Sequence, residues 1–290
     1  MKRQDINIRD PFILADGNEF FLYGSTDKNV WAGKCESFEM YRSSDLENFD
    51  APVKVFVKTD EFWADENFWA PEVHKYNGRY YMFASFFTNG RRRASQILTA
   101  ESPYGPFLPF DNVLTPPEWD CLDATLYVED GKPYAVFCHE WTQIRDGEIC
   151  RVPLSDDLRT PLAAPEKIFS ASAAPWVKGF ATEKCDDNYI TDGPFFHKLK
   201  SGKLLMLWSS NGNDGYAVGM AVSDSGSVCG EFRHIAEPLF RNDGGHAMLF
   251  KVGDRLILTL HQPNMPSGSE RPVFFECEEC EDRIRIVKPI

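Results

Sequence analysis

The sequence predicts an all-β protein, a five-bladed β-propeller in which mostly four-stranded antiparallel sheets surround a central channel. Two short apolar runs separated by a Gly-containing turn occur five times, and the copies begin 51 to 69 residues apart along 290 residues. Repeated units of this size bury their apolar faces against neighbouring copies. We therefore expect one domain over residues 1–290. Each copy opens with an ionisable residue, namely Asp10, Glu72, Asp123, Asp192 and His246.

Each copy is expected to begin with a β-hairpin, because two short apolar runs that flank a Gly turn are typical of one. The turns lie at residues 16–17, 77–78, 130–131, 201–202 and 253–254, and the second apolar runs lie at 20–23, 80–83, 134–137, 204–207 and 256–258.

A third strand is expected after each hairpin, and it often ends in a Ser-Asp phrase, at residues 44–45, 155–156 and 223–224. In the second copy, Pro and Gly at 103–106 end the strand instead. A fourth strand is predicted in some copies, for example at 53–56. Units of four strands packed radially make a propeller. The alternating segments 272–276 and 283–287 are expected to close the ring beside the first residues.

The propeller geometry predicts a pocket at one end of the channel. Innermost strands run roughly along the axis, so their first residues emerge at one end, and the second strands return antiparallel to that same end. The returning residues include Phe86, Phe87, Glu140, Trp141 and Trp208. The mouth of the channel is therefore expected to be acidic and aromatic.

The composition restricts the class of partner and the compartment. The formal net charge of −13 argues against nucleic acid or an anionic membrane as partner, and no apolar run approaches the roughly 18 residues of a membrane span. No signal peptide is visible after Met1, so a cytoplasmic location is expected as encoded, or a periplasmic or secreted one if a leader has been removed. The eight scattered cysteines indicate reduced thiols.

An ordered set of motifs resembles glycoside hydrolase family 43. The set comprises Arg-Asp-Pro-Phe at 9–12, Trp-Ala-Pro-Glu-Val at 69–73, Asp123, Asp-Gly-Pro-Phe at 192–195 and Gly-Gly-His at 244–246. The resemblance implies a five-bladed propeller that hydrolyses glycosidic bonds with inversion in arabinose- or xylose-containing plant oligosaccharides, as an α-L-arabinofuranosidase or a β-xylosidase. It implies no required cofactor, although a structural calcium or other cation in the central channel remains open.

The resemblance also implies roles for three carboxylates. By family position Asp10 is the general base, and Asp123 orients the acid and raises its pKa. The family generally has Glu where this chain has Asp192, one methylene shorter. Three readings stay open: Asp192 is the acid, Glu140 supplies it, or the chain is a non-catalytic or weakly active carbohydrate-binding propeller.

Further side chains are candidates for substrate binding because sugar rings stack on apolar faces, although propeller blades also pack on aromatics. The expected contacts are Glu72, Trp69, Phe87, Glu140, Trp141 and Trp208. For Glu72 a hydrogen bond within the channel, without contact to substrate, is the alternative. His246 is expected on the central axis, where it holds an ion through water or serves packing. The run Arg91-Arg92-Arg93 is expected in a solvated loop, with a position at the rim of the pocket as the alternative.

Overall fold

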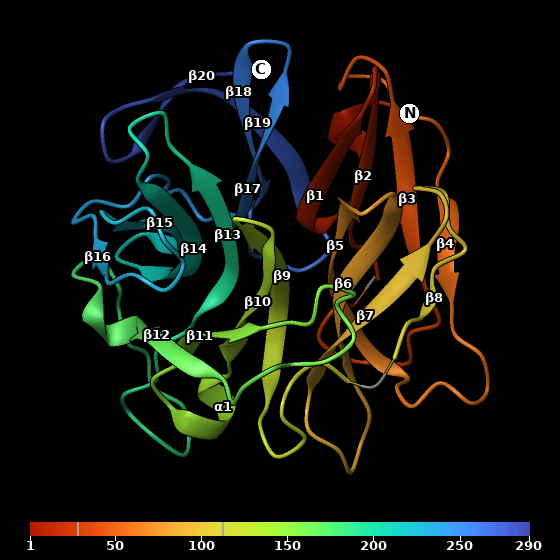
Figure 1. The fold of residues 1–290 in the computed structure, drawn as a ribbon, viewed down its shortest axis with the longest axis horizontal. Coiled ribbons are helices and arrows are strands. Elements are labelled where there is room, and N and C mark those ends of the chain that lie inside the picture. The colour runs from red at the N-terminus through yellow and green to blue at the C-terminus, as the bar shows by residue number, and fades with distance from the viewer. Residues whose placement is uncertain (28, 112) are drawn as a thin grey trace.

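The computed structural model describes residues 1–27, 29–111 and 113–290. It contains five four-stranded antiparallel sheets arranged as a ring (Figure 1), which confirms the predicted fold class. In each sheet the strands follow chain order, so each blade is one continuous segment. Chain ends N and C lie on the same side of the ring in this view. The N–H of Ile8 donates to the carbonyl oxygen of Glu270, which ties the first residues to the last blade.

The strands have the following bounds. Blade 1 contains β1 (Arg9–Asp16), β2 (Glu19–Ser25), β3 (Ser37–Ser43) and β4 (Val53–Val57). Blade 2 contains β5 (Glu66–Tyr76), β6 (Arg79–Phe87), β7 (Ala94–Ala100) and β8 (Leu108–Pro109). Blade 3 contains β9 (Cys121–Glu129), β10 (Lys132–His139), β11 (Glu148–Pro153) and β12 (Glu166–Ser170). Blade 4 contains β13 (Asp192–Lys198), β14 (Leu204–Gly212), β15 (Gly215–Ser223) and β16 (Phe232–His234). Blade 5 contains β17 (Gly245–Val252), β18 (Arg255–Gln262), β19 (Arg271–Glu279) and β20 (Ile284–Pro289).

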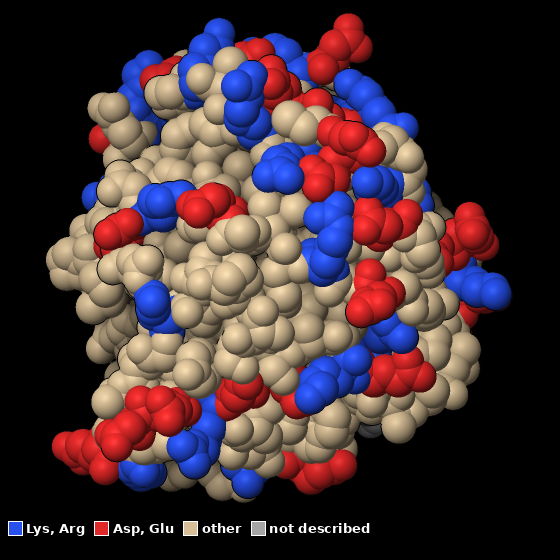
Figure 2. Space-filling view, turned by 90° about the vertical axis from the view of Figure 1, so that its left-hand side faces the viewer, with Lys and Arg blue, Asp and Glu red and all other residues tan. Residues whose placement is uncertain are grey.

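Helices are short in the part of the chain that the structure describes. They are η1 (Arg3–Asp5), α1 (Trp141–Ile144) and η2 (Ala171–Ala173). None of these described helices has the length or the apolar character needed to traverse a bilayer. On the face drawn in Figure 2, acidic and basic side chains are intermixed around an uncharged central area.

The core is divided among the interfaces between blades. Each pair of neighbouring blades encloses a cluster of buried apolar side chains. Between blades 1 and 2, for example, Phe38, Phe56 and Phe86 pack with ring centroids 5.7 to 6.0 Å apart. A single blade cannot bury both of its faces, so the ring is the smallest unit with a complete core.

The innermost strand of every blade carries a β-bulge near its beginning. The residue that opens the bulge has a left-handed backbone, with φ between 47° and 56° in all five blades. For residues other than Gly this conformation is strained, and bulges often re-aim side chains at functional sites. The equivalent residues are Asp10, Ala70, Asp123, Gly193 and His246.

This equivalence corrects the register expected from the sequence. Asp192 lies one residue before the bulge position of its blade, and Glu72 lies two residues after the position occupied by Ala70. Asp192 is the last paired residue before its bulge and Glu72 is the first paired residue after its bulge, so neither occupies the bulge position from which Asp10 and Asp123 project. The five ionisable residues therefore do not form one symmetric ring.

The bulges are tied to the preceding blades by hydrogen bonds. In three blades the bulge N–H donates to a serine hydroxyl at the end of the preceding blade's second strand, over 2.8 to 2.9 Å. These donor and acceptor pairs are Ala70 with Ser25, Asp123 with Ser85 and His246 with Ser209. The contacts fix the backbone from which the site residues project.

Candidate active site

A cavity of about 410 Å³ lies where the bulged strands begin. All five blades or the loops between their strands contribute to its wall, as expected for a site at the end of a propeller channel. Eight residues that the sequence singled out line it, namely Asp10, Trp69, Arg93, Asp123, Glu140, Trp141, Asp192 and His246. The structure thus brings together all three carboxylates to which the family resemblance assigns catalytic roles.

Asp10 is held in its ionised form. Its Oδ2 accepts a hydrogen bond from the Ser25 hydroxyl at 2.7 Å, and its Oδ1 lies 3.2 Å from Nδ1 of His246. Burial alone would raise the pKa of Asp10, but the charge and hydrogen bond of His246, with the charge of Arg9, hold that pKa well below its ordinary value. Asp10 is therefore a carboxylate at any pH at which the protein would work.

His246 is a charge partner of two carboxylates. Its Nδ1 lies 3.2 Å from Oδ1 of Asp10 and 3.7 Å from Oδ2 of Asp123. Burial lowers the pKa of His246, but the charges of Asp10 and Asp123 outweigh burial and raise the pKa to about 10. The imidazole is therefore a cation near neutral pH, and it compensates the negative charge at the base of the pocket.

The side chains around His246 determine whether a metal ion could bind there directly. Within residues 1–27, 29–111 and 113–290, no group of three or more His, Cys, Asp or Glu side chains is arranged to hold a metal. Nδ1 is engaged by carboxylates, and Nε2 is buried without a hydrogen-bond partner among the described residues. Calcium prefers oxygen ligands, so these residues do not fit direct coordination. A cation held through water remains a prediction.

Asp123 and Asp192 are the carboxyl groups that favour the protonated form. Burial raises the pKa of Asp123 to about 8, with the charges of Asp192 and Asp10 adding to burial and that of His246 opposing it. Burial also raises the pKa of Asp192 to about 6, against a hydrogen bond from Tyr216. That hydroxyl donates to Oδ2 of Asp192 at 2.7 Å. The N–H of Gly193 donates to Oδ2 of Asp123 at 3.0 Å and links the two groups.

Glu140 is engaged by an arginine from the neighbouring blade. Nε of Arg93 donates to Oε2 of Glu140 at 3.1 Å, and the guanidinium carbon lies 4.0 Å from the ring centroid of Trp69. Nε1 of Trp69 donates to the carbonyl oxygen of Val30 at 2.6 Å, which fixes the indole ring. Loops of blades 1, 2 and 3 thus build one continuous wall of the pocket.

Sequence reasoning missed Tyr216 and Trp31, and it assigned no role to Arg9. Arg9 forms an ion pair of 3.0 Å with Glu270 and lies 4.8 Å from the ring centroid of Trp31. Trp31 is 52% exposed and lines the pocket. Arg9 stands beside Asp10 in the motif, which is a usable signal, whereas Tyr216 and Trp31 belong to no motif that the sequence revealed.

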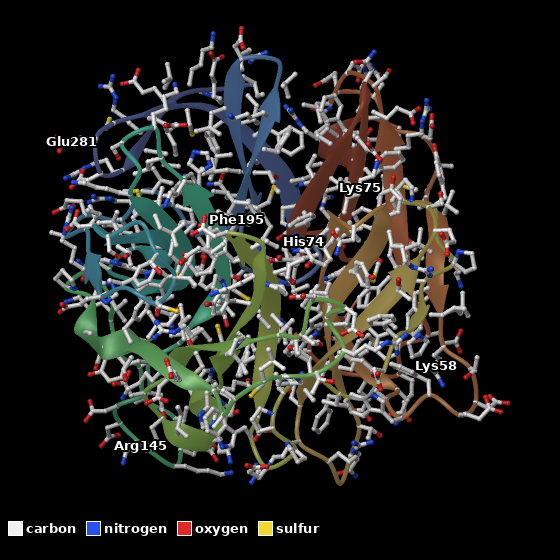
Figure 3. The ribbon with its side chains drawn as sticks, in the orientation of Figure 1. Lys58, His74, Lys75, Arg145, Phe195 and Glu281 are labelled. Carbon is white, nitrogen blue, oxygen red and sulfur yellow. The ribbon has the colours of Figure 1, made fainter. Side chains whose placement is uncertain are left out.

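Three predicted substrate contacts are wrong in position. Trp208 has no exposed surface and packs against Trp176 and Phe169 between blades, so no sugar can reach it. Glu72 is buried outside the pocket wall, with Oε2 3.2 Å from Nε2 of His74. Figure 3 shows the labelled His74 and Phe195 between the innermost strands, where the channel is filled by side chains. Phe87 does not line the cavity, and its ring centroid lies 5.3 Å from the guanidinium carbon of Arg93.

The comparison with protein families agrees with this geometry. Residues 5–271 match the model described as "Glycosyl hydrolases family 43". The chain belongs to this family. It is therefore a glycosidase, as the resemblance in its motifs predicted.

Individual relatives share the fold over nearly the whole chain. The endo-arabinase from Bacteroides thetaiotaomicron VPI-5482 is 38% identical, with a TM-score of 0.89 over 97% of this chain and 98% of that one. A thermostable family-43 glycoside hydrolase is 22% identical, with a TM-score of 0.83 over 98% and 93% of the two chains. The extracellular exo-α-(1→5)-L-arabinofuranosidase ArbA of Cellvibrio japonicus (strain Ueda107) is 22% identical over 88% of this chain and 74% of its own length.

Proposed function

We propose that this glycosidase hydrolyses α-L-arabinofuranosidic bonds in arabinose-containing plant oligosaccharides, with inversion at the anomeric carbon. The observation that carries the proposal is the division of the pocket carboxyl groups into one with a strongly lowered pKa and two with raised pKa values. Pairs of titratable groups whose pKa values differ in this way are typical of acid and base roles. The choice of arabinose is supported by the relatives, which include an arabinofuranosidase and an endo-arabinase.

The proposed reaction is a single displacement. Asp10 accepts a proton from a water molecule as that water attacks the anomeric carbon. The bond between that carbon and the glycosidic oxygen breaks, and Asp192 donates its proton to the departing oxygen. Asp123 stays protonated up to a higher pH than Asp192, and the charge that Asp192 acquires when it ionises disfavours ionisation of Asp123. His246 remains charged throughout and stabilises the carboxylate of Asp10.

Asp192 is a better candidate for the acid than Glu140. One oxygen of Glu140 already accepts from the guanidinium of Arg93. Among the described residues, Asp192 accepts a single hydrogen bond, from the phenol of Tyr216 to Oδ2, and its pKa is raised to about 6. An acid works best when its pKa lies near the working pH, and this condition favours Asp192.

Substitution of each candidate distinguishes them. We expect Asp192→Asn to slow hydrolysis of alkyl arabinofuranosides by about 100-fold or more, and that of activated aryl arabinofuranosides much less, because only poor leaving groups need the proton. Glu140→Gln should show no such dependence on the leaving group. The reverse pattern would assign the acid to Glu140. A panel of aryl arabinosides, xylosides and galactosides tests the sugar, and preference for a xyloside would contradict the proposed substrate.

A carbohydrate-binding propeller without turnover is the second candidate, and the observation in its favour is the short side chain at position 192. Losing one methylene withdraws the carboxyl group by roughly 1.5 Å, and a misplacement near 1 Å can cost about 100-fold in rate. Binding of an arabinoside in calorimetry, with no product after prolonged incubation, would favour this candidate.

A further inference from the structure

Three consecutive arginines in the loop between β6 and β7 have different surroundings. The guanidinium carbon of Arg91 lies 4.5 Å from the ring centroid of Trp63, and Arg92 forms an ion pair of 2.7 Å with Asp120. Neither of them lines the active-site cavity, whereas Arg93 does. The rest of the run thus offers matched controls for Arg93.

Arg93 is held rigidly in the pocket wall. Its guanidinium lies 4.0 Å from the ring centroid of Trp69 and 5.3 Å from that of Phe87. Nε donates to Glu140, and only 13% of the side chain is exposed. The backbone N–H donates to Oδ1 of Asp120 at 2.9 Å, which fixes the loop as well. A side chain held by two aromatic rings and an ion pair has little conformational freedom left to lose when a ligand binds.

The opposite edge of the guanidinium lacks protein partners. Nη1 is buried without an acceptor among the described residues, and no hydrogen bond joins Nη2 to any of them. A guanidinium carries five N–H donors and no acceptor, and a buried donor without a partner is costly. Nη1 is closed off from the cavity, but Nη2 is not buried in this way and can donate to a ligand oxygen there.

The position of the Arg93 and Glu140 pair indicates which part of the ligand it meets. Arg93, Glu140 and Asp192 line the same cavity, and the charge of Glu140 contributes to the raised pKa of Asp192, so the pair stands near the proposed acid. The group next to an acid meets the departing oxygen and the sugar attached to it. Glu140 also neutralises the charge of Arg93, so the pair has no net positive charge with which to attract a carboxylate ligand.

We propose that Arg93 binds the leaving-group sugar by donating from Nη2 to a hydroxyl oxygen of an uncharged sugar unit. This assignment rests on the proposed function, because the leaving-group side is defined by the acid. It makes Arg93 a residue that determines specificity for oligosaccharides over simple glycosides. Arg93 acts on binding and takes no part in the proton transfers.

The test compares Arg93→Met with Arg91→Met on two substrates. One is a 1,5-linked arabinobiose, whose leaving group is a sugar, and the other is an aryl arabinofuranoside, whose leaving group has no hydroxyls. Loss of a charge-assisted hydrogen bond should lower kcat/KM for arabinobiose by about 10- to 100-fold in Arg93→Met. The value for the aryl substrate should stay within about 3-fold, and Arg91→Met should match the wild type on both.

Calorimetric binding of arabinobiose separates this inference from the proposed function. If the wild type binds arabinobiose without hydrolysing it, and Arg93→Met binds it at least about 10-fold more weakly, the inference stands and the proposed activity falls. Equal losses on both substrates, or no loss in Arg93→Met, would overturn the inference while leaving the activity intact. Should Arg93→Met fail to fold, Arg93→Lys keeps the charge but loses the planar fork, and the same selective loss is expected.

Discussion

Replacing Tyr216 by Phe should move the alkaline limit of activity upward. The Tyr216 hydroxyl donates to Oδ2 of Asp192 at 2.7 Å, and this bond stabilises the ionised carboxylate and lowers its pKa. A hydrogen bond to a charged group contributes about 1.5–3 kcal/mol, equivalent to about 1–2 pKa units. Without it, the pKa of Asp192 should rise from about 6 toward 7 or 8.

The sign of the effect on rate follows from the role of the acid. Asp192 must be protonated to act, so kcat/KM falls as the pH rises through its pKa. A raised pKa extends activity to higher pH, and the Tyr216→Phe enzyme should keep its activity about 1–2 pH units further. Because Asp192 and Asp123 interact, the pKa read from the alkaline limit of activity is an apparent value that belongs to the pair.

The assay is the pH profile of kcat/KM for an aryl arabinofuranoside between pH 4 and 9. Phe should fit the same space, because the ring of Tyr216 already stacks on His261 with centroids 5.8 Å apart. Tyr80→Phe is a matched control, since Tyr80 also donates to a carboxylate, that of Asp16, outside the pocket. An unchanged alkaline limit in Tyr216→Phe, or one that moves to lower pH, would refute the assignment of Asp192.

Three further predictions test the base, the buried acid and the bulge. Asp10→Asn should lower kcat by about 100-fold or more while circular dichroism is unchanged, and near-normal activity would exclude Asp10 as the base. The pKa of Asp123 is raised to about 8 from an ordinary 3.8, so ionisation of Asp123 destabilises the fold as the pH rises over that interval. In urea unfolding, the stability of Asp123→Asn relative to the wild type should therefore be at least about 1 kcal/mol higher at pH 9 than at pH 4. An equal difference from the wild type at both pH values would contradict the raised pKa. Gly193→Ala should cost about 1–3 kcal/mol more than Gly202→Ala, because both have positive φ but only the former puts a Cβ 2.8 Å from the ring of His246.

The fold could be predicted because its determinants are local. Gly turns between short apolar runs define each hairpin, and five such units occupy the chain. The register of the site could not be predicted in the same way. A bulge adds one residue to a strand, and in two blades that residue is Ala70 or Gly193, neither of which carries a chemical signal. The pattern of ionisable residues in the sequence therefore places Glu72 and Asp192 at the positions that Ala70 and Gly193 occupy in the structure.

The sequence also does not reveal which aromatic and basic side chains reach the pocket. Trp208 and Ser209 are adjacent near the end of β14, and adjacent strand residues face opposite ways. Ser209 accepts from the N–H of His246 beside the pocket, so Trp208 faces the interblade core. Arg93 reaches the pocket because Trp69 and Glu140 from two different blades hold it. Contacts among loops of separate blades leave no periodic pattern in the sequence.

The most direct test of the proposed mechanism is the anomer that appears first when an α-L-arabinofuranoside is hydrolysed, followed by proton NMR before mutarotation. With Asp10 ionised as the base and Asp192 protonated as the acid, water attacks in a single displacement. The mechanism predicts β-L-arabinofuranose as the first product. Initial formation of the α anomer would show retention, and it would contradict the assignment of Asp10 as a base that activates water.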